Sequence, residues 1–191
     1  MNEYAVIGFG AVTGIALSSA VGFRIFVPFL VAAIAAKLGI VSVAADFAWL
    51  SSWPALAVLS VAALSELLAY YVPVLDHAFD VIGAPAAVIA GTLLTASMVV
   101  GMDEWLRWSL ALIAGGGVAG ALHSTMATIR GASTVTTAGL ANPIVATGEA
   151  LGATVTAVSA LAIPVVVVVI AVIAIVVMSR MIVRRVWKKA T

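Results

Sequence analysis

The sequence predicts an all-α fold, a polytopic bundle of transmembrane helices, and three observations lead to this prediction. First, 64% of the 191 residues are hydrophobic and only 9% are charged, whereas soluble domains carry about 25% charged residues. Second, runs such as AIPVVVVVIAVIAIVVM are continuously apolar, without the alternation that a membrane barrel strand requires. Third, backbone polar groups in lipid must bond within the protein, which a helix achieves within its own segment.

Windows of about twenty apolar residues predict about six spans. Five windows are strongly apolar, and a sixth is diluted by Gly, Thr and Glu149. Trp and Tyr residues flank several windows, as is typical of the membrane interface. In chain order the windows are residues 4–22, 54–72, 81–102, 106–129, 143–161 (the diluted one) and 162–180.

One further segment, residues 25–38 (IFVPFLVAAIAAKL), is too apolar for a loop and too short for a regular span. We expect a re-entrant or broken helix here, because irregular backbone at membrane depth is tolerated where protein shields it. The alternative is that residues 25–45 cross the membrane and make seven spans. The stretch after Arg130, GASTVTTAGLANP, is expected to be an unwound polar connection.

An internal repeat relates residues 5–24 to residues 111–130. Both copies contain the order Gly-x3-Gly-x3-Ser-[Ser/Thr]-x4-Arg, which predicts an ancient duplication. Three spans in each half would insert the second half upside down, as in transporters with inverted repeats and a substrate site at the repeat interface. If residues 25–45 cross instead, both arginines lie on the cytoplasmic side. The single transmembrane domain, 1–191, then divides into halves of about 1–102 and 103–182 and a basic tail at 183–191.

The arginines of the repeat, Arg24 and Arg130, are the strongest candidates for a binding site. A charged residue at the bilayer centre costs about 2.5–3.5 kcal/mol on insertion scales, unless it snorkels to the interface. A guanidinium near hydroxyl donors suits a carboxylate, a phosphate or another anion. The hydroxyls have a simpler alternative role, which is to bond carbonyls of their own helix. The candidate substrate-binding residues are Arg24, Arg130, Ser18, Ser19, Ser124, Thr125 and Asn142.

Acidic residues within or near the spans are candidates for proton or ion coupling. Two of them, Glu66 and Glu149, lie inside predicted spans and have an alternative role as ion-pair partners of the arginines. Three more titratable residues lie in the turn LDHAFD, which has the alternative of a solvated connection. The coupling candidates are Glu66, Glu149, Asp76, His77 and Asp80. We expect no metal, no cofactor and no catalytic residue, because His123 beside Ser124 lacks an orienting third group.

The charge distribution predicts the topology and the partners. Five of the nine basic residues fall in the last twelve positions, so by the positive-inside rule the C-terminus is cytoplasmic. We expect an integral protein of the bacterial inner (plasma) membrane, with no cleaved signal segment. The partners are then the lipid bilayer and a small solute or lipid headgroup, with no nucleic acid. The sequence leaves a homo-oligomer open.

Three sequence blocks resemble an uncharacterised family of bacterial membrane proteins, domain of unknown function 4126. The blocks are AVGFRIFVPFL, SELLAYYVPVLDHAFD and GLANPIVATGEA, and the resemblance covers essentially the whole chain. Two features of the family pattern are replaced here, an Asp-Lys pair by Tyr70 and Tyr71, and an Asp after Glu149 by Ala150. The resemblance implies no activity. Polar positions that the chain shares with the family pattern are Arg24, Glu66, Asp76, Asn142 and Glu149.

Together these features predict a small integral membrane transporter or channel. It moves a small anionic solute or a lipid headgroup through a polar pathway at the repeat interface. The alternative is a structural or assembly membrane protein, in which the intramembrane charges only form stabilising ion pairs.

Overall fold

The computed structural model describes the backbone of residues 2–69 and 73–190, and the side chains of residues 2–69 and 82–181. All regular elements in these residues are helices, as predicted. In chain order they are α1 (Glu3–Val21), α2 (Phe26–Lys37), the 3-10 helix η1 (Ala45–Ser51), α3 (Trp53–Ala69), α4 (Pro73–Met98), α5 (Glu104–Leu110), the π-helical segment η2 (Ala111–Gly116), α6 (Gly117–Thr137), α7 (Asn142–Ala162) and α8 (Pro164–Ala190).

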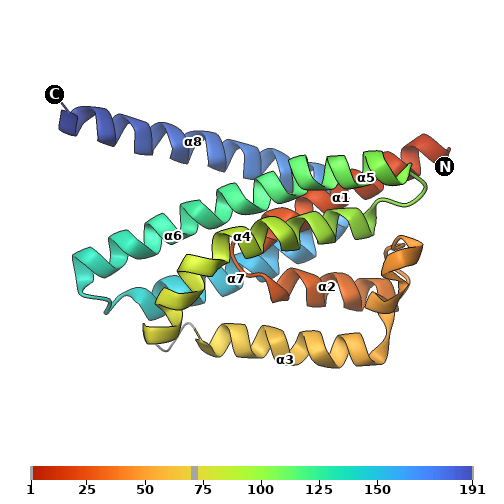
Figure 1. Cartoon of the computed structure of the whole chain (residues 1–191), viewed down its shortest axis with the longest axis horizontal. Coiled ribbons are helices and arrows are strands. Elements are labelled where there is room, and N and C mark those ends of the chain that lie inside the picture. Colours follow the sequence, from red (N-terminus) through yellow and green to blue (C-terminus); the bar gives the residue numbers. More distant parts are fainter. Residues whose placement is uncertain (1, 70–72, 191) are drawn as a thin grey trace.

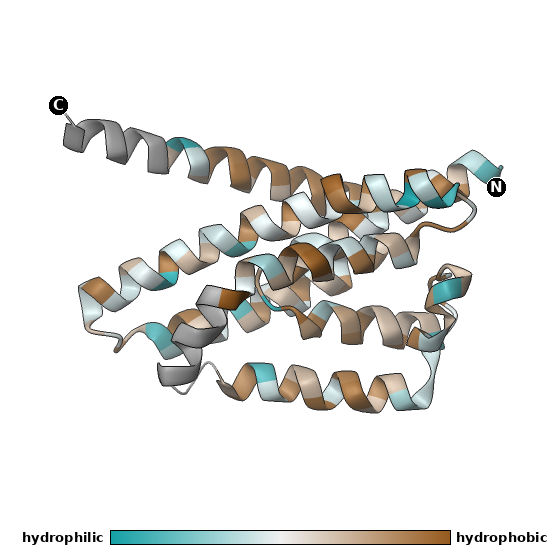
Figure 2. Cartoon of the chain, in the orientation of Figure 1, coloured by the Kyte–Doolittle hydropathy of each residue, from teal (hydrophilic) through white to brown (hydrophobic). Residues whose placement is uncertain are grey.

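The helices lie side by side along one long axis (Figure 1). Apolar residues cover much of their length, with the strongest run in the first half of α8 (Figure 2). Among the described residues, four helices are long and apolar enough to cross a membrane, and the bent pair formed by η1 and α3 makes a fifth if it counts as one span. The four are α1, the continuous helix Glu104–Thr137, α7 and the Pro164–Met181 part of α8.

The predicted broken segment after the first span forms the helix α2. This helix has 12 residues, too few to cross a bilayer at 1.5 Å per residue. It runs back toward the end of the bundle at which α1 begins, so α1 and α2 form a helical hairpin (Figure 1). The turn between them lies within the protein, because Arg24 is only 1% exposed.

Helices α1 and α4 pack closely and run antiparallel. A Cβ added to Gly10 would meet the backbone of Met98, near the end of α4. Further along α1, the Ser18 hydroxyl donates to the Gly91 carbonyl at 2.7 Å, near the middle of α4. Small residues on α1 therefore let the two backbones approach, which is the usual way for membrane helices to associate.

Helix α4 is also antiparallel to η2 and α6. A Cβ on Gly91 would lie 2.7 Å from the Gly115 carbonyl oxygen, and a Cβ on Gly83 would clash with the His123 ring. Because α1 and α6 both run opposite to α4, the two copies of the repeated motif run in the same direction. The predicted inverted arrangement is therefore wrong for these helices, and the same orientation is visible in Figure 1.

The two ends of the described chain lie at opposite ends of the bundle (Figure 1). An even number of passages, such as the predicted six, would bring both ends to the same side. The α1–α2 hairpin accounts for the difference, because α2 returns the chain toward the end of the bundle at which α1 begins without being long enough to cross a bilayer.

The stretch after Arg130 is helical rather than unwound, which corrects a second expectation. Helix α6 continues to Thr137 and ends at Ala138, whose φ of 50° is left-handed. The Thr134 hydroxyl donates to the Arg130 carbonyl at 3.0 Å, and the Thr137 hydroxyl donates to that of Ser133 at 2.8 Å. Hydroxyls bonded back to their own helix let this polar sequence stay helical.

Candidate functional site

The candidate site forms where α1 ends and α2 begins. The first N–H groups of a helix have no partner within it and need an outside acceptor. Glu66 of α3 provides one, because its two carboxylate oxygens accept the Ile25 N–H at 2.7 Å and the Phe26 N–H at 2.9 Å. A carboxylate at this position also complements the positive end of the helix dipole. Glu66 therefore stabilises the start of α2 and with it the break after α1.

Both arginines of the repeat meet at one carboxylate. The Nη1 of Arg130 donates to Oε2 of Glu149 at 2.8 Å, and the Nη2 of Arg24 lies 3.3 Å from the same oxygen. The Nη2 of Arg24 also donates to the backbone carbonyl of Ala146 at 2.9 Å. The three side chains come from the α1–α2 turn, α6 and α7, so the cluster joins three parts of the chain that are far apart in sequence.

The cluster is shielded from solvent. Arg24 is 1%, Arg130 2%, and Glu66 and Glu149 each 4% exposed. Arg130 lies about two helical turns, roughly 10 Å, before the end of α6, and Glu149 lies as far after the start of α7. Arg130 thus does not snorkel to the end of α6. With both acids ionised, these four buried groups carry no net charge.

A histidine that is not among the predicted binding or coupling residues lies near this cluster. His123 is 2% exposed and packs against Gly83 of α4 and Gly22 at the end of α1. It lies seven residues, about two helical turns, before Arg130 on α6. The signal in the sequence was its spacing, because His123 and Arg130 are two turns apart and share one face of α6.

The hydroxyls of the repeat do not gather around the guanidiniums. Ser18 bonds to α4, Ser19 donates to the Ala16 carbonyl at 2.6 Å, and exposed Ser124 donates to the Gly120 carbonyl at 2.8 Å. Thr125 is buried on α6. On α6 helical geometry explains the separation, because residues six apart, such as Ser124 and Arg130, point about 120° away from each other around a helix.

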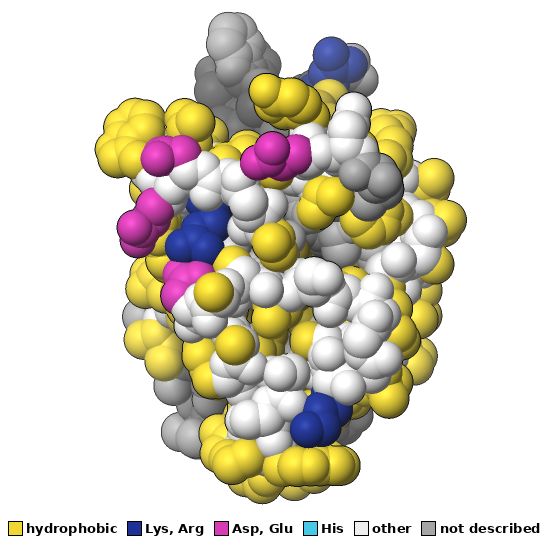
Figure 3. All heavy atoms as spheres, turned by 90° about the vertical axis from the view of Figure 1, so that its right-hand side faces the viewer, with side chains coloured by type: hydrophobic (Ala, Val, Ile, Leu, Met, Phe, Trp, Pro, Cys, Tyr) yellow, Lys and Arg dark blue, Asp and Glu magenta, His cyan; other side chains and the backbone are white. Residues whose placement is uncertain are grey.

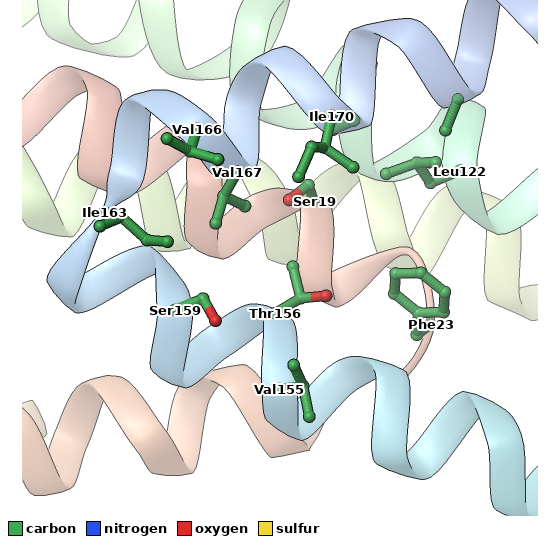
Figure 4. A pocket seen from close by; sticks show the side chains of 12 residues that line it. Ser19, Phe23, Leu122, Val155, Thr156, Ser159, Ile163, Val166, Val167 and Ile170 are labelled. Atoms are coloured by element: carbon green, nitrogen blue, oxygen red, sulfur yellow. The ribbon is translucent and has the colours of Figure 1, made fainter.

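An apolar groove of about 200 Å³ extends from Ile163 to Phe23, between α1, α6, α7 and α8 (Figure 4). Three hydroxyl-bearing residues line it, Ser19, Thr156 and Ser159. The Phe23 ring closes one end and packs on α7, where a Cβ on Gly152 would lie 3.3 Å from it. Phe23 immediately precedes Arg24, so the groove ends at the residue next to the charge cluster.

A comparison with known protein families shows to which family the chain belongs. The domain of unknown function 4126 (DUF4126) matches residues 11–184, which is most of the sequence. The chain belongs to the DUF4126 family. Neither the curated proteins nor the solved structures contain a significant match to it.

The remaining site candidates of this DUF4126 protein lie away from the cluster or outside the described side chains. Asn142, at the start of α7, donates to the Thr134 hydroxyl at 2.9 Å and so joins α6 to α7. The side chains of Asp76, His77 and Asp80 lie outside the described residues. Within the part that is described, no group of three or more His, Asp or Glu side chains is placed to hold a metal ion.

Acidic side chains gather at the end of this DUF4126 protein where α1 and α5 begin (Figure 3). Arg107 of α5 forms a bidentate pair there with Asp46 of η1, with distances of 2.8 and 2.7 Å. The hydrogen bonds from Arg107 hold the pKa of Asp46 below its ordinary value of 3.8. The other acidic residues at this end are Glu3, Asp103 and Glu104.

Proposed function

We propose that this protein is a membrane transporter for a small anionic solute, with Arg24 and Arg130 as the groups that bind the anion. The observation that carries the proposal is the convergence of two buried guanidiniums on one carboxylate oxygen of Glu149. Burying such charges costs several kcal/mol per ion before their attraction is counted. Binding sites of many transporters lie at broken helices within the membrane, and the α1–α2 break adjoins this cluster.

The pathway we propose has two parts. On one side of the cluster, the groove that ends at Phe23 brings the solute next to Arg24. On the other side, Arg130 and Glu149 are each about two helical turns from the end of the bundle where α6 joins α7. Movement of the Phe23 ring off α7 would connect the groove to the cluster.

The orientation we propose places the C-terminus in the cytoplasm and the protein in a bacterial inner membrane. The basic residues in the last part of the sequence support it, because cytoplasmic ends carry an excess of Lys and Arg. We further propose that α1 and α2 form a re-entrant hairpin from the outer side and that five helical segments cross, beginning with α3.

The test is anion flux into proteoliposomes of the purified protein. We would measure uptake of labelled chloride, phosphate and L-lactate by wild-type protein and by Arg24→Gln and Arg130→Gln. The matched control is Lys37→Gln, which removes an exposed cation that lies over the Trp53 ring. We expect each arginine variant to lose at least about tenfold in flux and the control to stay within about twofold.

A lipid headgroup offers the same anionic chemistry from another source. A parallel measurement of labelled phosphatidylglycerol crossing the bilayer separates the two sources. The transport proposal is wrong if folded wild-type protein transports none of the three anions and does not move the lipid across the bilayer.

The second candidate is a structural or assembly protein, and one observation favours it. Both oxygens of Glu66 bond backbone N–H groups, and Glu149 bridges two arginines, so these acids already hold four segments together. On this proposal the arginine variants lose thermal stability or a co-purifying partner, and wild-type protein supports no flux.

A further inference from the structure

The carboxylate of Glu149 occupies the position that the proposed function assigns to an anion. Its Oε2 lies between the Nη1 of Arg130 and the Nη2 of Arg24. We propose that Glu149 is a built-in competitor of the transported solute, that this solute is a small monocarboxylate, and that it binds when Glu149 takes up a proton and leaves the arginines. The inference rests on the proposed anion transport and adds its substrate class and its coupling to protons.

The substrate class follows from what the two arginines already bind. Their guanidinium nitrogens surround one oxygen of a carboxylate, at 2.8 and 3.3 Å. Planar guanidinium groups match carboxylates in geometry as well as in charge. Arg24 is held by the Ala146 carbonyl in addition to Glu149, so its position does not depend on Glu149 alone. A solute carboxylate that replaces that of Glu149 would therefore meet a site already formed.

Charge balance supplies the coupling. With Glu149 ionised, the two guanidiniums share one carboxylate, and a second carboxylate beside it would bury an additional unbalanced charge. When a proton from water binds the Glu149 carboxylate, the solute brings one negative charge and the proton one positive charge. The total charge of the site stays the same, and Glu149 releases the proton when the solute leaves. One proton therefore accompanies each monocarboxylate, and the movement is electroneutral.

Other titratable groups near Glu149 must be separated from it in any pH experiment. Glu66 is the matched control, because it is an equally buried acid whose oxygens bond backbone N–H groups instead of bridging two arginines. His123 is the second control, because it is a buried titratable group on the same face of α6 as Arg130. In the described part of the elements around Glu149, the charged and titratable side chains are Arg24, Arg130, His123 and Glu66, with Glu3 and Tyr4 at the start of α1 and Lys37 and Arg180 farther along α2 and α8.

The experiment measures binding of sodium L-lactate to the purified full-length protein in detergent by calorimetry, between pH 5.5 and pH 8. At pH 7.5 we expect Glu149→Gln to bind lactate at least about tenfold more tightly than wild type, without dependence on pH. Wild-type affinity is expected to rise about tenfold for each unit by which pH is lowered, over the range where Glu149 is ionised, because binding of one solute is linked to binding of one proton. Glu66→Gln and His123→Gln should keep this pH dependence.

The inference is overturned if Glu149→Gln binds lactate no more tightly than wild type, or if its binding still depends on pH. Loss of the pH dependence in His123→Gln would assign the proton to the imidazole and would equally overturn it. If Glu149→Gln does not fold, the wild-type titration decides, and affinity that stays constant with pH is the contrary result. Flux of chloride or phosphate without any lactate binding would leave the proposed transport standing and remove this inference alone.

Discussion

The ion pair between Arg130 and Glu149 is predicted to contribute to stability in a non-additive way. The perturbation is a double-mutant cycle of Arg130→Gln, Glu149→Gln and the two together. We expect Glu149→Gln to be the more damaging single change, because it leaves two buried guanidiniums without the carboxylate that both contact. Arg130→Gln is milder, because Glu149 keeps its contact with Arg24.

The magnitude follows from burial and from the number of charges left unbalanced. Both partners are at most 4% exposed, and removing one partner of a buried pair typically costs about 3–5 kcal/mol. Interactions inside a bilayer are weaker in measured cycles, so we expect the lower end of that range, about 3 kcal/mol, for Glu149→Gln and about 2 kcal/mol for Arg130→Gln. The double variant should cost about 3 kcal/mol, which leaves a coupling energy of about 2 kcal/mol.

The assay is reversible unfolding by SDS in mixed micelles, followed by far-UV circular dichroism. The buffer must lack small carboxylates, because these are expected to refill the site in Glu149→Gln. Lys37→Gln serves as the exposed control and should change the unfolding free energy by less than about 0.5 kcal/mol. Effects of the two single variants that add to within about 0.5 kcal/mol would refute the reasoning, as would a larger loss in Arg130→Gln than in Glu149→Gln.

Three further predictions concern other parts of the chain. Because the pKa of Asp46 is lowered by Arg107, its pairing stabilises the protein above the ordinary value of 3.8, and this contribution is lost as pH falls through the lowered value. Asp46 is 47% exposed, so the unfolding free energy of wild type should exceed that of Asp46→Asn by less than about 1 kcal/mol at pH 7, and this difference should shrink at pH 3. Gly14→Leu should lower the free energy of unfolding in SDS by about 2 kcal/mol or more, because a Cβ at this position would lie 2.8 Å from a backbone atom of α4. Gly117→Ala is the control and should not lower it, because no atom lies within 4 Å of a Cβ added there. Ala138→Gly should raise the unfolding free energy by about 1 kcal/mol, because it removes a left-handed φ of 50° from a residue with a Cβ, and an unchanged thermal midpoint would contradict this.

The helices and the charged members of the site could be predicted because both depend on simple properties of the sequence. Long apolar windows give helices wherever lipid is the solvent. Charges are so rare in such windows that each buried one stands out, and Arg24, Glu66 and Glu149 are all among the buried residues. The pairing of these charges could not be predicted in the same way. Which arginine contacts which acid depends on the depth in the bundle at which α1 ends.

The direction of the repeat could not be predicted from spacing, because it depends on whether the chain turns back after α1, as it does at α2. Glu66 helps to decide this by accepting the first N–H groups of α2 and so fixing a helix start inside the bundle. The hydroxyls do not lie where their constant spacing from the arginines predicts. Ser124 lies on another face of α6 than Arg130, and Arg24 lies beyond the end of α1, whose Ser18 bonds to α4.

The two copies are parallel but not equivalent, and this difference bears on the chemistry of the site. Each half of the chain supplies one arginine and one acid to the cluster, yet the acid of the first half, Glu66, is bonded to the backbone at the start of α2. Arg24 therefore shares the acid of the second half with Arg130. In an inverted arrangement the arginines would have approached from opposite sides of the membrane. In the parallel one they meet at a single oxygen, so that the two arginines share one carboxylate, that of Glu149.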